Sequence, residues 1–376
     1  MNLNLTAALA NALTARAETH GQLLQRGLAS DGLSGDIART APEPLSKPVL
    51  QLNAFPVTLN PANFANPYSR QNPAGDMRAS YAFRKLVDPV PSLSRTYNPS
   101  GHSIEELYGN LVNYASISGN QRFVVGAFNS ANKKFSEAAL SALSIMPGEW
   151  RLVGAMPSDW YDVTEVKRFQ DVELDLTGSE DASGPFTVMP GSESPQWRLG
   201  DPARPEATAA PHKDTQILSL KFKYLQVTFE RPWLDFELFD LSGWSLQGQP
   251  RGYYSTGRID DNRGVLPLLP TSLILGIDIA ADVHLGGEDS DLVAHAVTAK
   301  KALSLGPFQF TAMAAPGASK EVRCKAGTAD SAGAVLHVVG MISTLVPLAP
   351  KDSSMESDFR KRRGRETRRH NYQGRP

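Results

Sequence analysis

The sequence is poor in cysteine and has no long apolar run. Cys324 is the single cysteine, which excludes an internal disulfide framework and favours a reducing compartment. The most apolar window, residues 265–281, contains two prolines and an aspartate, and so falls short of the about 18 residues of a transmembrane helix. Residues 1–6 have neither a basic start nor an apolar core, so they do not resemble a secretory signal peptide. We expect a soluble protein that is cytoplasmic, or exported without such a signal.

Catalytic motifs that can be recognised by their spacing are also absent. The sequence contains no G-x-x-x-x-G-K-[ST] phosphate loop, no G-x-G-x-x-G dinucleotide motif, no H-E-x-x-H or C-x-x-C metal motif and no G-x-S-x-G nucleophile turn. We therefore expect no cofactor, and a non-enzymatic role is favoured over an enzymatic one.

What the sequence does contain is typical of a folded chain with a polarised charge. The apolar fraction is 41% and the charged fraction 20%, and a length of 376 residues favours two domains over one. The net charge of -1 hides an asymmetry, because nine Lys or Arg face four Asp or Glu from residue 351 onward. That tail carries +5 and the rest of the chain -6.

Residues 1–100 divide into two predicted segments. In residues 1–40, Leu5, Leu9 and Leu13 recur at the spacing of an amphipathic helix. Residues 41–100 contain ten prolines, which predicts an irregular, extended arm. Because solvated spacers rarely carry aromatic rings, we expect the arm to lie on a surface of its own chain or of a neighbouring subunit. The candidate interface residues in it are Phe55, Phe64 and Tyr68.

Residues 101–200 predict a helical hairpin followed by short strands. Ser103 and Glu106 form a capping box for a helix over 104–117. A second helix is expected to end at Pro147, and the alternation of residues 172–176 predicts a strand. The proline- and alanine-rich stretch 201–211 is interpreted as the linker between two domains.

Residues 212–350 predict an antiparallel β domain. The apolar positions change parity within 218–229, which is typical of a β-bulge, and residues 273–285 alternate regularly. Residues 286–291 are interpreted as a hairpin loop, and 335–346 as a strand covered on both faces. The expected fold class is α+β, with a helical N-terminal region, the extended arm, a β-sandwich-like domain and a disordered basic tail over 351–376.

The polar face of the 273–285 strand carries a candidate metal or acid/base site. Asp278, Asp282 and His284 share that face, and residues two apart lie close enough to meet at one metal ion. The alternative is an ordinary solvated sheet face, which is favoured because no fourth ligand is in view. The acidic turn 288–291 offers oxygen ligands for calcium, but its spacing fits no calcium-loop pattern.

Aromatic residues crowd residues 231–244. Trp233 and Trp244 suit a buried core, a protein interface or a sugar-stacking platform, and the helical spacing of the leucines between them favours the core. Both tryptophans join the candidate interface residues. His337 lies in the doubly apolar strand, where a hydrogen-bonded core histidine is expected.

The most specific feature is the basic tail. Its seven cations, Arg360, Lys361, Arg362, Arg363, Arg365, Arg368 and Arg369, would bind a dense anion through counterion release. The alternative is a tail that only improves solubility.

Three functions follow from these features. The leading hypothesis is a structural or interaction subunit that self-associates, forming a homo-oligomer or larger assembly, and holds nucleic acid or an anionic surface through its tail. The second is a toxin-like, pore-forming membrane-active protein, because residues 273–285 are long enough for a tilted transmembrane strand. The third is an enzyme of unrecognised family with Asp282 and His284 in its site.

Overall fold

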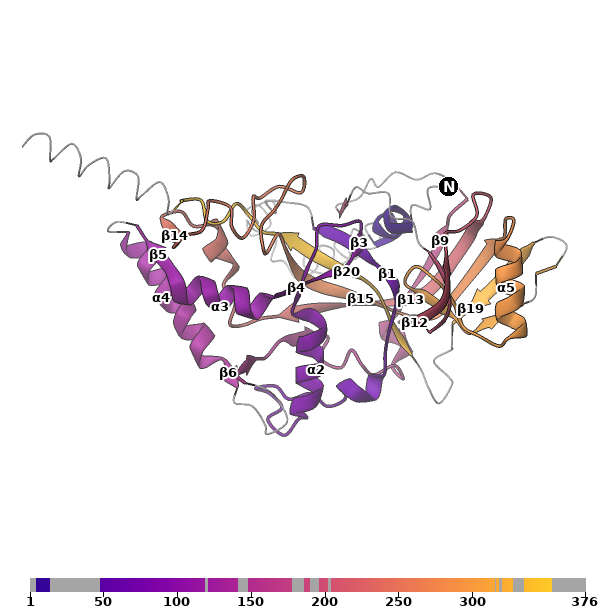
Figure 1. Cartoon of the computed structure of the whole chain (residues 1–376). Helices are drawn as coiled ribbons and strands as arrows, with labels where there is room; N and C mark the ends of the chain where they lie inside the picture. Colours follow the sequence, from indigo (N-terminus) through magenta and orange to yellow (C-terminus); the bar gives the residue numbers. More distant parts are fainter. Residues whose placement is uncertain are drawn as a thin grey trace, which may run out of the picture.

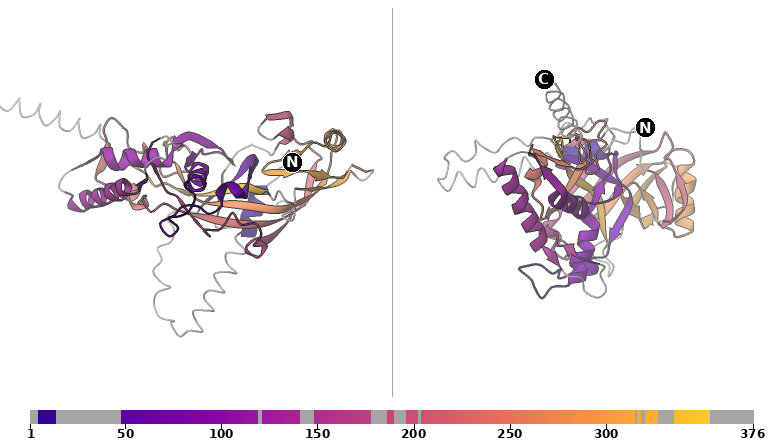
Figure 2. Two further views of the ribbon diagram at one scale, coloured as in Figure 1. Left: turned by 90° about the horizontal axis from the view of Figure 1, so that it is seen from below. Right: turned by 60° about the vertical axis from the view of Figure 1, so that its left-hand side comes forward.

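The computed structural model describes residues 5–13, 48–118, 121–140, 148–177, 186–189, 196–201, 204–314, 316–317, 320–326 and 335–353. These residues form a mixed α+β fold whose sheets are largely antiparallel, which confirms the predicted class. The molecule is long, with α3 and α4 at one end and α5 at the other (Figures 1 and 2). Among the residues described, none of the helices combines the length and apolar character needed to cross a membrane.

A ten-stranded sheet runs through the molecule, in the order β10-β1-β20-β15-β13-β8, with β3 on β1, β9 on β13, β19 on β15 and β18 on β19. Only β3 and β10 pair in parallel, both with β1. The strands are β1 (Val49–Leu59), β3 (Thr96–Tyr97), β8 (Gly154–Met156), β9 (Gln170–Asp175), β10 (Thr187–Val188), β13 (Gln216–Glu230), β15 (Leu268–His284), β18 (Ala312–Met313), β19 (Glu321–Lys325) and β20 (Leu336–Leu345).

Smaller sheets and helices surround this sheet. The four-stranded sheet consists of β12 (Arg204–Ala209), β11 (Trp197–Asp201), β16 (Leu303–Leu305) and β17 (Phe308–Phe310). Two-stranded sheets join β2 (Pro89–Pro91) to β4 (Pro99–Ser103), β5 (Ala115–Ile117) to β14 (Trp244–Leu246), and β6 (Ala139–Leu140) to β7 (Trp150–Arg151). The α-helices are residues 5–13, α2 (Met77–Val87), α3 (Ile104–Tyr114), α4 (Arg122–Glu137) and α5 (Asp289–Thr298), and the 3-10 helices are η2 (Pro61–Phe64), η3 (Val166–Arg168) and η4 (Phe236–Asp240).

The parity change predicted within β13 divides the protein into two cores. Leu220, Phe222 and Tyr224 belong to one core, whereas Leu225 and Val227 belong to the other. The β13–β15 ladder has irregular register between residues 217 and 219 and between 221 and 223, as a bulged pair requires. The first core is covered by α2, α3 and α4, and the second by the helix of residues 5–13 and by the four-stranded sheet. Since helices cover the first core, the sandwich-like part of the prediction is not confirmed.

Several local predictions hold. Ser103 caps α3 by accepting the Glu106 N–H at 3.2 Å. Leu5, Leu9 and Leu13 are buried on one helix face, while residues 14–29 lie outside those described. The strands expected near 172–176, 273–285 and 335–346 are β9, β15 and β20, and β20 is buried on both faces over most of its length.

The extended arm is the main error. Residues 49–59 form β1, which lies inside the sheet between β10 and β20, and residues 77–87 form α2. Pro56 falls where the β1–β20 register is interrupted between Leu52 and Val57, so its missing N–H breaks no regular ladder. Asp76 caps α2 by accepting the Arg78 N–H.

Three further predictions are corrected. The supposed linker 201–211 contains the strand β12, which pairs antiparallel with β11. The ten-stranded sheet takes strands from both sides of that stretch, β8 and β9 before it and β13 after it. The supposed loop 286–291 begins α5, and α4 ends at Glu137 instead of continuing towards Pro147, with residues 141–147 outside the description.

Candidate functional site

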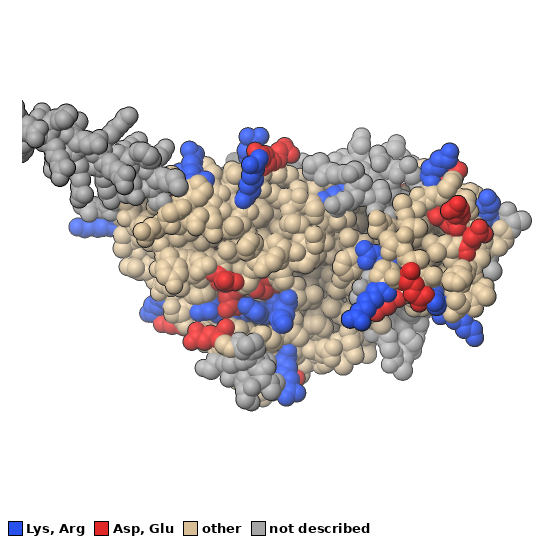
Figure 3. All heavy atoms as spheres, in the orientation of Figure 1, with Lys and Arg blue, Asp and Glu red and all other residues tan. Residues whose placement is uncertain are grey.

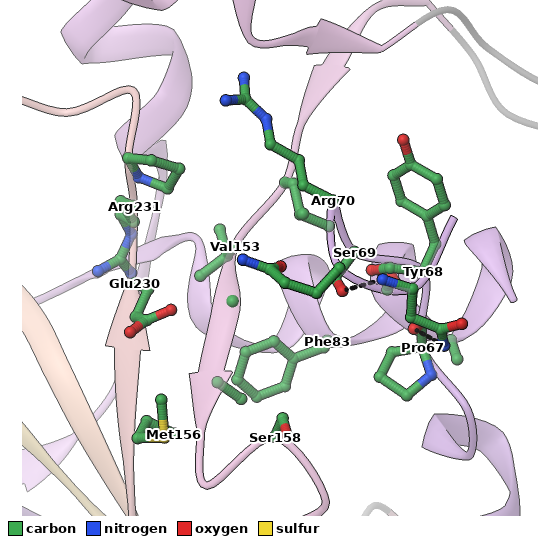
Figure 4. A pocket seen from close by; sticks show the side chains of 18 of the residues that line it. Pro67, Tyr68, Ser69, Arg70, Phe83, Val153, Met156, Ser158, Glu230 and Arg231 are labelled. Carbon is green, nitrogen blue, oxygen red and sulfur yellow. Dashed lines mark hydrogen bonds between the residues drawn. The ribbon is translucent and has the colours of Figure 1, made fainter. Parts of the chain in front are cut away.

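A pocket of about 1050 Å³ lies at the edge of the ten-stranded sheet. One wall is the loop 66–72 and the opposite wall is formed by β8 with Glu230 and Arg231. Figure 4 shows Phe83 between these walls, with Glu230 and Arg231 on one side and Tyr68 and Ser69 on the other. The pocket therefore separates a loop from an edge strand and has polar groups on both sides.

The loop wall is held by its own hydrogen bonds. The Asn72 side chain donates to Asn66 Oδ1 at 2.8 Å and to the Pro67 carbonyl at 3.0 Å. Ser80 Oγ, on α2, donates to the Tyr68 carbonyl at 2.8 Å. A Cβ at Gly75 would approach the Pro67 oxygen to 2.3 Å, so a glycine is needed for this close approach. The wall is consequently a fixed surface.

The floor of the pocket is aromatic. Phe64 and Phe83 both contact Trp160, with ring centroids 5.0 and 5.3 Å apart, and all three side chains are buried. Such a floor offers dispersion and stacking contacts to a flat or apolar ligand.

Arg231 fixes the strand wall. Its guanidinium donates to the Pro270 carbonyl at 2.6 Å and to the Val87 carbonyl at 2.8 Å, which ties β15 and α2 together. Burial lowers the pKa of Arg231 to about 10, and the nearby Asp88 opposes that shift. With its donors directed at backbone carbonyls, Arg231 acts in positioning the wall.

The pocket has little equipment for covalent chemistry. No described histidine or cysteine lines it, and Asp159 on its rim forms an ion pair with Arg168. A nucleophile with an adjacent base is the minimum for acyl or group transfer, and no such pair is found among the described lining residues.

The predicted metal residues lie on the half-buried face of β15. Asp282 is paired with Arg323 at 3.0 Å and accepts a hydrogen bond from Ser219 at 2.9 Å. Asp278 has a positive φ of 53° at the irregular part of the β13–β15 ladder, and His284 lies opposite Glu321 of β19. Within the described ranges, no three His, Cys, Asp or Glu side chains are grouped so that they could hold a metal ion.

Asp289 of the acidic turn is hydrogen-bonded within the fold. It is buried, and its Oδ2 accepts from Trp197 Nε1 at 3.0 Å, from the His212 N–H at 2.9 Å and from Thr215 Oγ1 at 2.5 Å. These bonds join α5 to the four-stranded sheet. The carboxylate thus supports the fold at the position where calcium had been considered.

The predicted interface residues separate into buried and exposed groups. Trp233, Trp244 and Phe64 are buried in the first core of this chain. Tyr68 is half-buried in the pocket wall. Phe55 is 40% exposed, with the Arg198 guanidinium 4.7 Å above its ring, and it alone of the five remains an exposed candidate.

The pore-forming hypothesis relied on β15. That strand lies inside the sheet between β13 and β20, and most of its side chains are buried in the two cores. Exposing it to lipid would require dismantling both cores, so the structure offers this hypothesis no support.

The cations of the tail, Arg360 to Arg369, lie outside the described residues. The chain leaves the described part at Ser353. The Gly243 N–H donates to Asp352 Oδ2 at 2.6 Å, and the Gly243 carbonyl accepts from the Ser118 N–H at 2.9 Å. The tail therefore starts beside the end of the molecule that carries β5 and the start of α4.

Sequence reasoning missed exposed apolar residues at this same end. Phe123 is 77% exposed and Tyr114 69%. The signal was present, because Val124, Phe128, Ala131 and Phe135 follow the helical period and leave Phe123 off the buried face. The pocket had no comparable signal, since its walls come from residues far apart in sequence.

No protein-family model, curated protein or solved structure matches this chain.

Proposed function

We propose that this protein is a non-enzymatic interaction subunit that self-associates and holds a polyanionic partner through its basic tail. The proposal draws on the position of Ser353, where the chain leaves the described part next to an end with exposed aromatic side chains. A cationic segment that starts beside an exposed apolar surface can combine electrostatic attraction with short-range contacts.

The charge distribution also favours this end of the molecule as the place where a polyanion binds. Residues 107–136, which include most of α3 and α4, contain three Lys or Arg and no Asp or Glu, and of these Lys133 and Lys134 are paired with Glu137 and Asp235. Residues 241–259, which include β14, contain two Arg and no acid. Because β5 pairs with β14, these two stretches meet, and the tail leaves from a surface that would not repel a polyanion.

Self-association is assigned to a different surface, the one around Phe55. This ring is exposed at an irregular part of β1, beneath Arg198 of β11. An exposed aromatic ring with a stacked guanidinium is a common centre of protein interfaces. Phe55→Ser would remove the ring without disturbing either core.

The experiment is size-exclusion chromatography with light scattering, at low and high salt, on three proteins. They are the full chain, Phe55→Ser, and a tail-neutral variant in which the seven Lys and Arg from Arg360 to Arg369 are Gln. We expect the full chain to form an oligomer and to carry an anionic partner that high salt removes. The F55S protein should lose the oligomer, and the tail-neutral variant should lose the anionic partner.

The outcomes separate the two parts of the proposal. A full chain that stays monomeric at all concentrations would refute self-association. An anionic partner retained by the tail-neutral variant would refute the role of the tail.

A further inference from the structure

The strand β8 forms one margin of the ten-stranded sheet and also one wall of the pocket. Within the described residues its only strand partner is β13, so no strand lies on its other side. Gly154, Ala155 and Met156, which make up β8, all line the pocket. We call the space between β8 and the loop 66–72 the edge slot.

A proline fixes which backbone groups of β8 face the edge slot. Met156 is paired with Thr228, directly before Pro157. Two residues of an antiparallel pair are joined either by their own N–H and C=O groups or by those of their neighbours. The second arrangement needs an N–H at residue 157, which proline lacks. Met156 and, two residues earlier, Gly154 therefore bond to β13, and the N–H and C=O of Ala155 point away from it.

These two groups of Ala155 are open. Neither has a hydrogen-bond partner among the described residues, and Ala155 itself is half-buried in the pocket wall. Such an edge is a donor and an acceptor for one further strand.

The face of the sheet that carries Ala155 is aromatic. Residues opposite each other in a ladder share one face, and Ala155 is opposite Phe229, which is buried in the first core. The Phe229 ring contacts Phe83 at 5.9 Å between centroids, and Phe83 and Trp160 both line the pocket. A residue added opposite Ala155 would direct its side chain to these rings.

The other face carries a carboxylate. Gly154 is opposite Glu230, and a Cβ at Gly154 would lie 3.3 Å from both the Cβ and Oε2 of Glu230. The Glu230 side chain thus lies over the glycine, close to the edge of the sheet. Figure 4 shows Glu230 and Met156 together on one side of Phe83. A residue added opposite Gly154 would meet this carboxylate.

Glu230 differs from the other acids that line the pocket. Glu137 and Asp159 form ion pairs with Lys133 and Arg168, whereas the Glu230 side chain has no ion pair or hydrogen bond among the described residues. Figure 3 shows Asp or Glu next to Lys or Arg on the face that carries α4. A Lys or Arg of a ligand would give Glu230 the partner that this chain does not supply.

We propose that the edge slot binds an extended segment of a partner protein, added antiparallel to β8, in which an apolar residue is followed directly by Lys or Arg. The apolar residue exchanges two backbone hydrogen bonds with Ala155 and packs towards Phe83, and the basic residue reaches Glu230. In this mode backbone bonds supply affinity and alternate side chains supply specificity. The inference goes beyond the proposed function, because it uses neither the tail nor Phe55.

The edge slot favours a peptide over other occupants. Its pocket of about 1050 Å³ lies at the upper end of small-molecule sites, which have about 300–1,000 Å³. An open backbone donor and acceptor on one residue, with an apolar and an acidic face on either side, matches the alternation of a strand. A second copy is disfavoured, because its own loop 66–72 would accompany its β8.

The test uses fluorescein-labelled hexapeptides and fluorescence anisotropy with the full chain. Ser-Thr-Phe-Arg-Thr-Ser should bind, and the reversed core Ser-Thr-Arg-Phe-Thr-Ser should bind about tenfold more weakly. Glu230→Gln should weaken binding of the first peptide about tenfold, because it removes a charge-assisted contact. Glu173→Gln is the matched control, since Glu173 lies on the edge strand β9 outside the pocket and should leave the affinity unchanged.

The backbone contact is tested separately. Methylation of the phenylalanine amide nitrogen in the peptide should weaken binding about tenfold, because it removes the donor to Ala155 C=O, and methylation of the arginine amide nitrogen should have little effect. Ala155→Pro should abolish binding while leaving the circular dichroism spectrum unchanged, since the lost N–H does not bond to β13.

Several results would overturn the inference. They are no binding at about 1 mM peptide, equal affinities for the parent and E230Q, or equal affinities for the two methylated peptides. If phenylalanyl-arginine amide competes as well as the hexapeptide, the site takes a small cation and not a strand. If the peptide dissociates an oligomer of the protein, a second copy occupies the edge slot.

Discussion

His337 is a buried histidine, and its protonation links the stability of the fold to pH. It lies in β20 with 3% of its surface exposed, and burial lowers its pKa to about 4, although a hydrogen bond with the backbone of Pro307 opposes the shift. In the unfolded chain its pKa returns to about 6.5. The native state therefore holds His337 neutral. The contribution of this neutral histidine to the free energy of unfolding is fully present above pH 6.5 and is lost as the pH falls towards 4.

We expect His337 to account for a loss of about 3 kcal/mol in the free energy of unfolding across that pH range. Urea unfolding at several pH values, compared between the parent and His337→Gln, isolates this contribution because other acidic groups titrate in both proteins. His295→Gln, at an exposed position of α5, is the control. Parallel pH dependences for the parent and H337Q would contradict the assignment.

At the residue scale, sequence reasoning succeeded where burial followed from a local pattern. The doubly apolar strand around His337 predicted a core histidine, and the leucine spacing around Trp233 favoured the core over an interface, as the structure shows. It gave no indication that Phe64 is buried, because the Phe64 ring packs against Trp160, which lies far along the chain. Contacts between residues about a hundred positions apart leave no trace in a local pattern.

At the scale of elements, a buried ion network joins α2, α3 and β7. Glu105 of α3 contacts Arg84 and Arg151, each at 3.1 Å, and also accepts the Arg151 backbone N–H at 3.1 Å. Arg151 in turn donates to the Phe135 carbonyl of α4 at 2.6 Å, and Asp88 accepts from Ser103 at the start of α3. The helices on the first core are thus held together by charged groups that satisfy one another.

Glu105→Ala should lower the free energy of unfolding by about 3–5 kcal/mol, because it leaves the buried Arg151 guanidinium without its carboxylate and leaves the half-buried Arg84 with Asp88 alone. Asn110→Ala, at an exposed position of the same helix, should change it by about 0.5 kcal/mol or less. Urea unfolding of both variants gives the comparison. Equal effects would show that the network contributes no more than an ordinary surface position.

The sequence predicted elements well where period and capping agreed, as in α3, β9, β15 and β20. It missed β1 and α2 because the ten prolines of residues 41–100 predicted one irregular segment over the whole range. Pro56 lies where the β1–β20 ladder is already irregular, and α2 occupies a stretch free of proline. Similarly, Pro205 lies in β12, an edge strand, where a missing N–H costs little.

At the scale of the whole molecule, the long sheet links segments from both halves of the chain. β1 pairs with β20, and β13 pairs with β8 and β9, so neither half can complete its strands alone. We expect thermal unfolding to occur in one transition, with tryptophan fluorescence and far-ultraviolet circular dichroism coinciding. Chains ending at residue 200 or starting at residue 212 should not fold separately, and a folded half would contradict this account of the sheet.

At this scale we also propose that the end carrying β5, β14 and the start of α4, beside which the described chain ends at Ser353, is where the protein meets an anionic partner. Its most direct test is the salt dependence of binding to heparin, a polyanion without lipid or nucleobases, measured by fluorescence anisotropy for the full chain and the tail-neutral variant. We expect the affinity of the full chain to fall linearly with salt on logarithmic axes, and the tail-neutral variant to lose most of both affinity and slope. Equal affinity and slope for the two proteins would contradict it.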